Sequence, residues 1–164
     1  MTMIRWPQRN THATITKLVT DTLANLGWVG AGLLGSPSVT IINFDPQQAA
    51  EAIVPNTVAV TIPNEGNDVP MELGAGMREV PYTVFIDIFP SNDSVGQALS
   101  DDIKLPLVDG YFPLLDFSQT PPSAVPGAYI EIEHIVGNRF PQGTGVGKQT
   151  WRDLRLTAQL QYEP

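Results

Sequence analysis

Apolar and polar residues alternate along four stretches of the chain, and a period of two residues is typical of β-strands with one buried face. These stretches cover residues 57–62, 82–89, 128–136 and 153–162. The first two follow each other as a hairpin would, and so do the last two. The pattern therefore predicts a sheet that contains two β-hairpins.

Two further stretches predict shorter strands. Residues 39–44 are apolar at both alternating sets of positions, so this strand is expected to be buried on both sides or to lie at an interface. Residues 111–117 contain Pro113, which lacks the N–H group that a central strand must donate. We therefore expect the second of these strands at an edge of the sheet.

A helical period indicates two main helices. The first covers residues 11–26, with Asn10 or Thr11 as its cap, and residues 1–10 are expected to form an extended arm before it. The second follows the strand at 82–89 directly. Ser94 and Gln97 have the spacing of a capping box, and Pro106 is expected to end this helix.

The remaining segments are expected to be a short helix, two long loops and a linker. Asp45-Pro46 is a typical helix start, and Pro55 limits that helix to a few turns. Residues 63–79 and 137–149 connect the strands of the two hairpins, and connections longer than about 12–15 residues are uncommon unless they are functional or disordered. Residues 118–127 are rich in proline and are expected to form a stiff, extended linker.

Together these elements predict one domain over residues 1–164 of the α+β class. Its sheet is expected to be antiparallel or mixed, to be flanked by two main helices, and to carry the two long loops as projections.

Composition and charge narrow the classes of function. Only 16% of the residues are charged, against about 25% in a typical protein, which is expected when much of a surface is buried against partners. The net charge is −8 and no basic run exists, which argues against a protein that grips nucleic acid. The same charge is compatible with a channel wall past which DNA slides.

Export and membrane insertion are not indicated. The chain has no cysteine, its first residues lack the apolar core of a signal peptide, and no run of 18 or more apolar residues occurs. The sequence therefore predicts a protein made in the cytoplasm that does not enter a membrane.

No motif with catalytic spacing is present. GTGVGK at residues 143–148 does not fit the phosphate-binding loop, because Gln142 stands at the first glycine position and Gln149 at the magnesium-binding Ser or Thr. The histidines are His12, expected in solvent, and His134, expected on the apolar face of its strand as a core or interface residue. The sequence therefore predicts no cofactor, no metal and no enzymatic activity.

Two carboxylate pairs are the remaining candidates for chemistry. Asp101 and Asp102 are adjacent on the second main helix, and Glu131 and Glu133 share a strand face. Paired carboxylates can act as acid and base or bind calcium. Because no partner ligand is near them in the sequence, solvated faces are the first interpretation for both.

The order of elements resembles a known family. A first helix, antiparallel strands, the strand-to-helix unit VPYTVFIDIFPSNDSVGQALSDDI and a closing hairpin that ends in LRLTAQLQY are similar to the tail terminator (tail completion) proteins of long-tailed, siphovirus-like bacteriophages. Residues 118–127 and both long loops are longer than in a minimal member of that family.

The resemblance implies a structural virion protein with no enzymatic activity. It implies a homo-hexameric ring that is assembled in the host cytoplasm and lies in the tail and neck of the virion. This ring stops growth of the tail tube, contacts the tail tube protein on one side and the head–tail connector on the other, and lets DNA pass through its lumen without specific binding. A closed ring requires head-to-tail interfaces between subunits.

The resemblance also suggests which residues contact partners. The two loops would reach neighbouring subunits and adjacent rings. The interface candidates in and beside them are Glu65, Asp68, Glu72, Met77, Arg78, Arg139, Phe140 and Lys148. The candidates for an acidic lumen are Asp101, Asp102, Glu131 and Glu133.

Two alternatives remain open at this stage. One is a different neck component, such as a head-closure or connector subunit. The other is a small hydrolase or ligand-binding domain that uses the carboxylates of residues 131–134 together with His134.

Overall fold

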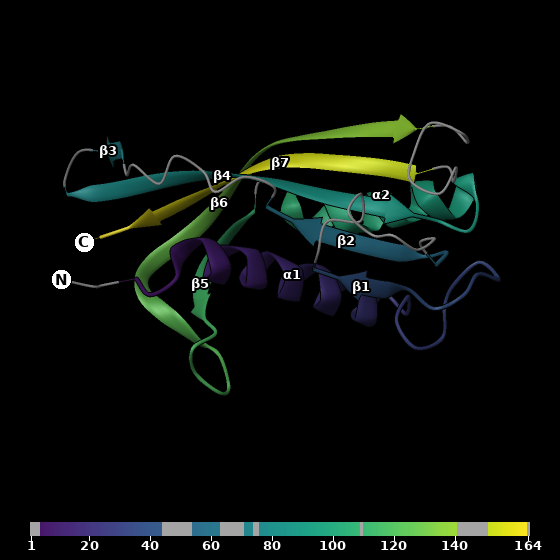
Figure 1. The fold of residues 1–164 in the computed structure, drawn as a ribbon, viewed down its shortest axis with the longest axis horizontal. Helices are drawn as coiled ribbons and strands as arrows, with labels where there is room; N and C mark the ends of the chain where they lie inside the picture. The colour runs from purple at the N-terminus through teal and green to yellow at the C-terminus, as the bar shows by residue number, and fades with distance from the viewer. Residues whose placement is uncertain are drawn as a thin grey trace.

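The structure is a computed structural model that describes residues 4–43, 54–62, 71–73, 76–108, 110–140 and 151–163. Within these residues the chain forms two helices and one curled, mixed β-sheet (Figure 1). The expected α+β class is therefore confirmed.

The sheet has six strands in the order β1-β2-β4-β7-β6-β5, and a short seventh strand, β3, pairs with the beginning of β4. In chain order the strands are β1 (Thr40–Ile42), β2 (Thr57–Thr61), β3 (Met71–Leu73), β4 (Met77–Phe89), β5 (Tyr111–Asp116), β6 (Ser123–Phe140) and β7 (Trp151–Tyr162). The pair β1–β2 is parallel and the other pairs are antiparallel. Both expected hairpin pairings, β2 with β4 and β6 with β7, are present.

The two helices, α1 (Pro7–Asn25) and α2 (Asp93–Leu107), share one apolar core with the sheet. Leu99 and Ile103 of α2 are completely buried in the same cluster as Leu154 and Leu160 of β7. The alternation along β7 therefore gives the sheet one face that packs on helices, which we call the helix-covered face. The side chains between these positions lie on the opposite face.

Helix α1 contacts both sides of the curled sheet, at β2 and at the edge strand β5 (Figure 1). His12 Nε2 donates a hydrogen bond to the carbonyl oxygen of Val60 in β2, at 2.7 Å. Two residues later, Thr14 Oγ1 accepts one from the backbone N–H of Leu115 in β5, at 3.1 Å. The expectation that His12 lies in solvent is therefore wrong, because its ring is needed at the contact between α1 and β2.

Helix α1 begins four residues earlier than the sequence pattern predicts. Trp6 precedes it in the left-handed conformation with φ 49°, and Pro7 occupies its first turn, where a missing N–H costs nothing. Residues 7–10 are thus helical and do not belong to an extended arm. Asn10 is not a cap: it is buried, it donates to the carbonyl of Arg5 at 2.7 Å, and it accepts from the N–H of Phe117 at 3.2 Å.

Helix α2 has the expected position with a different cap. The side chain of Asn92 accepts a hydrogen bond from the N–H of Val95 at 3.0 Å, so Asn92 replaces Ser94 as the cap. Pro106 lies in the last turn and the helix ends one residue later, at Leu107. The expected end of the helix is correct to within one residue.

Three expected connections are shorter in the structure. Residues 71–73 and 77–79 pair as the β3–β4 hairpin, and residues 137–140 belong to β6. Residues 118–127 are not a linker, because β6 already begins at Ser123 and pairs with β5 there. The remaining parts of the two long loops, 63–70, 74–75 and 141–149, lie outside the described residues, and so does most of the short helix expected after Asp45.

The two outer strands test two further expectations. Strand β5, which contains Pro113, lies at an edge of the sheet as expected. Strand β1 lies at the opposite edge, and its residues are exposed or half-buried, so burial of this strand on both sides is wrong for the single chain. Its role as an interface strand stays a prediction.

Candidate functional site

The sheet face opposite the helices carries a row of carboxylates. Ile130 and Ile132 point into the core, so alternation places Glu131 and Glu133 on the other side of β6. On the neighbouring β7, Gln159 and Gln161 point to that same side. We call this side of the sheet, with Glu79 of β4, the polar face.

Amide groups hold these carboxylates in place. Gln161 Nε2 donates to Glu131 Oε2 at 2.7 Å and to Glu79 Oε2 at 3.2 Å, and so bridges three strands. Gln159 Nε2 donates to Glu133 Oε2 at 3.2 Å. In the part of the chain that the structure describes, no Lys or Arg forms an ion pair with any of the three glutamates. The polar face therefore keeps its negative charge and attracts cations.

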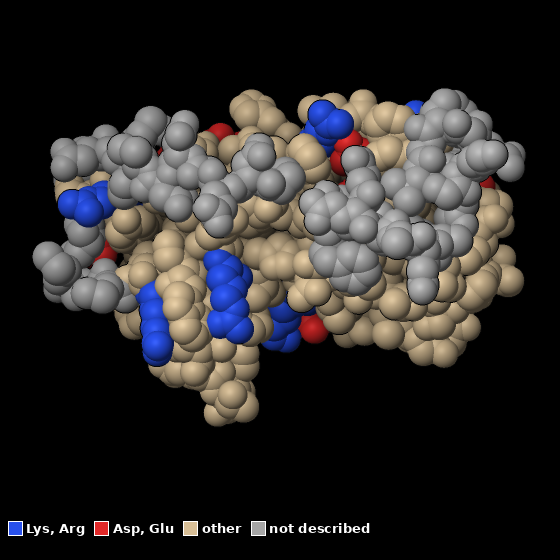
Figure 2. All heavy atoms as spheres, in the orientation of Figure 1, with Lys and Arg blue, Asp and Glu red and all other residues tan. Residues whose placement is uncertain are grey.

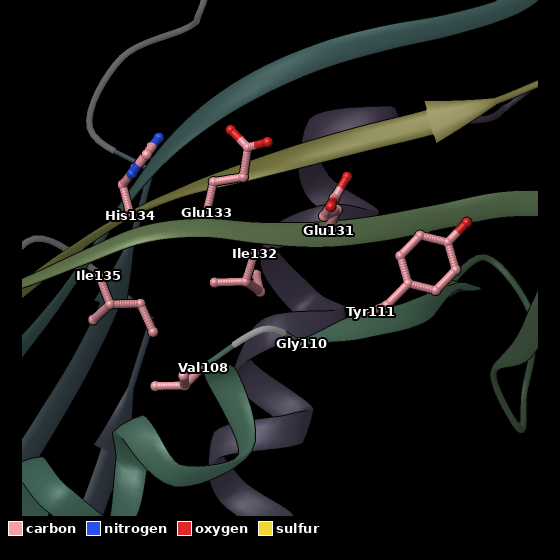
Figure 3. A pocket seen from close by; sticks show the side chains of 8 residues that line it. All are labelled: Val108, Gly110, Tyr111, Glu131, Ile132, Glu133, His134 and Ile135. Carbon is pink, nitrogen blue, oxygen red and sulfur yellow. The ribbon is translucent and has the colours of Figure 1, made fainter.

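A hollow of about 450 Å³ lies beside the polar face, where α2 leads into β5 (Figure 3). Its lining residues are Val108, Gly110, Tyr111, Glu131, Ile132, Glu133, His134 and Ile135. The two glutamates and His134 point to one side of β6, while Ile132 and Ile135 point to the other side. The hollow therefore has one acidic wall and one apolar wall.

Tyr111 forms the end of this hollow nearest to β5. Its ring stacks on Tyr129, with 5.0 Å between the ring centroids. Partial burial raises the pKa of the Tyr111 hydroxyl, and the neighbouring Tyr129 and Glu131 raise this pKa further. Tyr111 therefore stays neutral at physiological pH and offers an O–H donor.

His134 is displaced by a β-bulge. Its φ is 51°, and the register of β6 against β7 shifts between Glu133 and Val136. The ring is exposed, so the expectation of a core histidine on the apolar face is wrong. After the bulge Val136 pairs with Arg155 on the polar face, where its side chain is 55% exposed.

The reactive side chains in the lining of the hollow are Tyr111, Glu131, Glu133 and His134. The described residues that line it include no Ser, Thr, Cys or Lys side chain. Among the described residues, no group of three or more His, Cys, Asp or Glu side chains could hold a metal ion. What the arrangement can do is bind a positively charged or hydrogen-bonding group beside an apolar one.

The two lumen candidates on α2 lie on the other side of the sheet. Asp102 Oδ2 accepts a hydrogen bond from Trp28 Nε1 at 2.7 Å, and Asp101 forms an ion pair with Lys104 at 3.2 Å. Glu131 and Glu133, by contrast, lie on the polar face. If one face of the sheet lines a bore, only one of the two pairs, Asp101–Asp102 or Glu131–Glu133, can lie on the wall of that bore.

Two of the interface candidates make contacts inside the chain. Arg139 Nε donates to Asp93 Oδ1 at 2.8 Å, and Arg152 donates to the same oxygen at 3.2 Å. Phe140 stacks on Trp151, with 4.2 Å between the ring centroids. These contacts fasten the end of the β6–β7 hairpin to the start of α2.

The other interface candidates lie in the β3–β4 hairpin or outside the described residues. Glu72 of β3 pairs with Arg78 of β4, and Met77 pairs with Leu73. Glu65, Asp68 and Lys148 belong to the segments that the structure does not describe.

The sequence pattern missed Glu79, Gln159 and Gln161 as parts of the acidic site. Alternation along β7 places both glutamines on the correct face, which was a usable signal. Their partners on β6 are diagonal, however: Glu131 stands directly opposite Gln159 and bonds to Gln161. Only Glu79 of β4 bonds to the glutamine directly opposite it, Gln161. The cross-strand register, which is required to find such pairs, depends on the loop and the bulge between the two strands.

The ion pair at the start of α2 predicts a pH effect. Hydrogen bonding with Arg139 lowers the pKa of Asp93 below 3.8. Because the pKa of Asp93 is lower in the folded protein than 3.8, the ionised carboxylate stabilises the fold above pH 3.8. This stabilisation is lost as the pH falls through the pKa of the folded state. In Arg139→Gln the pKa of Asp93 is expected to rise toward 3.8, which a carboxyl ¹³C NMR titration measures.

Asp116 is the internal control for this titration. Hydrogen bonding with Ser118 lowers its pKa, and it lies in β5, away from Arg139. The Asp116 titration is expected to be the same in both proteins. An unchanged Asp93 titration would show that Arg139 is not the cause of its shift.

Charged groups are sparse on the described part of the face that Figure 2 shows. On the face shown in Figure 2, most described atoms belong to neutral residues, and Lys and Arg form a few separate groups instead of one basic patch. The described residues of that face therefore form no continuous basic surface.

No protein-family model matches the chain, and a search of curated proteins also gave no match. Among the described residues, neither helix has the length and apolar character needed to cross a membrane.

Proposed function

We propose that the protein is a phage tail terminator: a structural virion subunit that forms a ring at the head-proximal end of the tail tube, stops tube growth and joins the tail to the head connector. The polar face is the observation that carries this proposal. Glu79, Glu131 and Glu133 are held by amide donors and have no basic partner among the described residues. A bore through which DNA slides needs such a wall, because uncompensated negative charge repels phosphate groups.

The arrangement of elements supports the same proposal. The chain runs from a first helix through a hairpin to the β4–α2 unit and closes with the β6–β7 hairpin, which is the order on which the resemblance to tail terminators rests. The low share of charged residues, 16%, suits a subunit with much of its surface against neighbours.

Particles assembled without this protein test the proposal. We expect tails of irregular, excessive length that are not joined to heads, as seen by negative-stain microscopy. Tails of normal length joined to heads would refute a terminator. Native mass spectrometry of the purified protein, alone and with tail tubes, then measures the number of subunits in the ring.

Charge reversal tests the bore. With Glu79→Lys and Glu131→Lys together, DNA ejection from otherwise complete particles is expected to slow, because lysines on the wall hold phosphate groups. The matched control is Asp101→Lys, an exposed carboxylate on α2 behind the sheet. If both variants eject DNA at the unaltered rate, the polar face does not line the bore.

A different neck component is the nearest alternative. A head-closure or connector subunit would bind to the portal side, whereas a terminator binds to the end of the tail tube. Co-sedimentation of the purified protein with isolated tail tubes separates the two roles.

The hollow beside β6 favours a second candidate, a ligand-binding domain or small hydrolase. Its acidic wall combines Glu131, Glu133 and His134 with a volume of about 450 Å³, enough for a small molecule. Glu131→Ala and Glu133→Ala are expected to change the binding or hydrolysis of such a molecule. If neither variant changes any such activity or the metal content, this candidate is excluded.

A further inference from the structure

Strand β6 has an edge that no strand of the described chain covers. Strand β5 pairs with β6 only as far as Tyr111, which stands opposite Glu131. One more hydrogen bond follows, from the N–H of Ile132 to the carbonyl of Gly110 at 2.9 Å. From Glu133 to Phe140 the strand pairs with β7 on its inner side and with no described strand on its outer side.

This free edge is long enough to be a binding feature. Eight residues of strand extend over about 27 Å and present a row of backbone N–H and C=O groups. Proteins usually shield such edges, because an exposed edge pairs readily with another extended chain. Here Arg139 and the bulge at His134 are the shielding features, and no described strand pairs with the outer side of the backbone between them.

Two exposed apolar side chains lie at or beside the same edge. Val108, which directly follows α2, is 57% exposed and lines the hollow, and Val136 of β6 is 55% exposed. The hollow described above has Val108 and Ile135 in its lining and lies next to Tyr111, the first residue of β5. A chain lying along the edge would therefore cover apolar surface on one of its sides.

Glu133 gives the edge a charge preference. It is the last carboxylate of β6 before the bulge, and β5 does not extend far enough to stand beside it. Its one described partner is the neutral amide of Gln159, at 3.2 Å. Among the described residues, no Lys or Arg forms an ion pair with Glu133. A cation from a partner could therefore neutralise its charge.

We propose that the outer edge of β6 binds an extended, basic segment of a partner protein by strand addition. The segment continues the line of β5 across residues 133–140. A Lys or Arg of the segment lies beside Glu133 on the polar face, and the aliphatic stem of a second basic residue covers Val136 on that same face. Apolar side chains at the alternate positions cover Val108 on the other face. Charge complementarity selects a basic partner over a second copy of this chain, whose net charge is −8. The proposal is independent of the ring and holds for any function of the protein.

A synthetic peptide tests the chemistry directly. The probe is a blocked, fluorescently labelled eight-residue peptide in which Lys and Val alternate, and anisotropy measures its binding to the full chain. We expect saturable binding that weakens by about fivefold in Glu133→Gln, as for one partly exposed ion pair, and that weakens further in Val136→Lys. Asp101→Asn, which removes a charge behind the sheet, is the matched control and is expected to bind as well as the unaltered protein.

N-methylation separates strand addition from simple ionic attraction. Successive residues of a strand direct their N–H groups to opposite edges. A peptide that is methylated at every Lys therefore has one of its edges blocked, and a peptide that is methylated at every Val has the other edge blocked. Strand addition predicts that one of the two peptides loses binding and the other keeps it. Equal binding of both peptides would overturn the proposal, since their charges are identical.

Three further results would also overturn it. One is the absence of binding by the Lys–Val peptide, and another is equally tight binding of a peptide in which Glu replaces Lys. The third is self-association of the protein that Val136→Lys abolishes in analytical ultracentrifugation. That result would assign the edge to a second copy of the chain.

Discussion

Asn56→Ala is expected to lower the free energy of unfolding by about 2–3 kcal/mol, through two lost hydrogen bonds and backbone strain. Asn56 is completely buried. Its Nδ2 donates to the carbonyl of Pro37 at 2.7 Å, and its Oδ1 accepts from the N–H of Ser91 at 2.8 Å. One side chain thus joins the segment before β1, the start of β2 and the turn that leads into α2. Urea unfolding followed by circular dichroism measures the change.

Asn56→Gly separates the two causes of this loss. The φ of Asn56 is 61°, a left-handed conformation that Asn and Gly adopt more readily than Ala. Gly removes the same two hydrogen bonds without the strain, so we expect its loss of stability to be about 1 kcal/mol smaller. Equal stability of the Ala variant and the unaltered protein would show that the side chain of Asn56 is not a structural tie.

The sequence predicts the elements whose two sides have different environments. Strand β7 alternates clearly because Leu154 and Leu156 face the core while Arg155 faces outward. The same reason makes the β4–α2 unit and both long hairpins predictable from the pattern. In each of these elements, burial of one face is decided locally, by the order of side chains along the chain.

The missed features depend on contacts between distant residues. Asn10 has a typical capping side chain, yet it is used to bind the N–H of Phe117, 107 positions further along the chain. The first half of β6 contains Pro and Gly, but β5 supplies a partner strand for it. Tertiary contacts override local preference in both cases, and a single sequence does not show such contacts.

The polar face illustrates how far the candidate site could be predicted. Glu131 and Glu133 were recognisable as a pair on one strand face, which requires only alternation. The hollow beside them required three further facts: the point where β5 stops, the bulge at His134 and the exposed end of α2. None of these has a local signal in the sequence, so the carboxylates were found and the space beside them was not.

Leu99→Ala is expected to lower the free energy of unfolding by about 3 kcal/mol, the cost of removing a large apolar side chain from a packed core. Leu99 lies in the middle of α2 and is completely buried in the core cluster that also contains Ile103 and Leu156. The substitution leaves a cavity between α2 and the sheet. Leu99 does not line the hollow at the end of α2. We therefore expect Leu99→Ala to weaken peptide binding at the edge of β6 only under conditions in which part of the protein is unfolded.

Leu105→Ala is the matched control, with the same substitution on the same helix. Leu105 is 75% exposed, so its loss is expected to change the free energy of unfolding by less than about 0.5 kcal/mol. Binding of the Lys–Val peptide is expected to stay the same as well, because Val108 lines the hollow at the edge of β6 and Leu105 does not. The two leucines therefore separate the core role of α2 from its surface role. A large loss of stability in Leu105→Ala, measured by urea unfolding, would contradict this separation and place its side chain in the core.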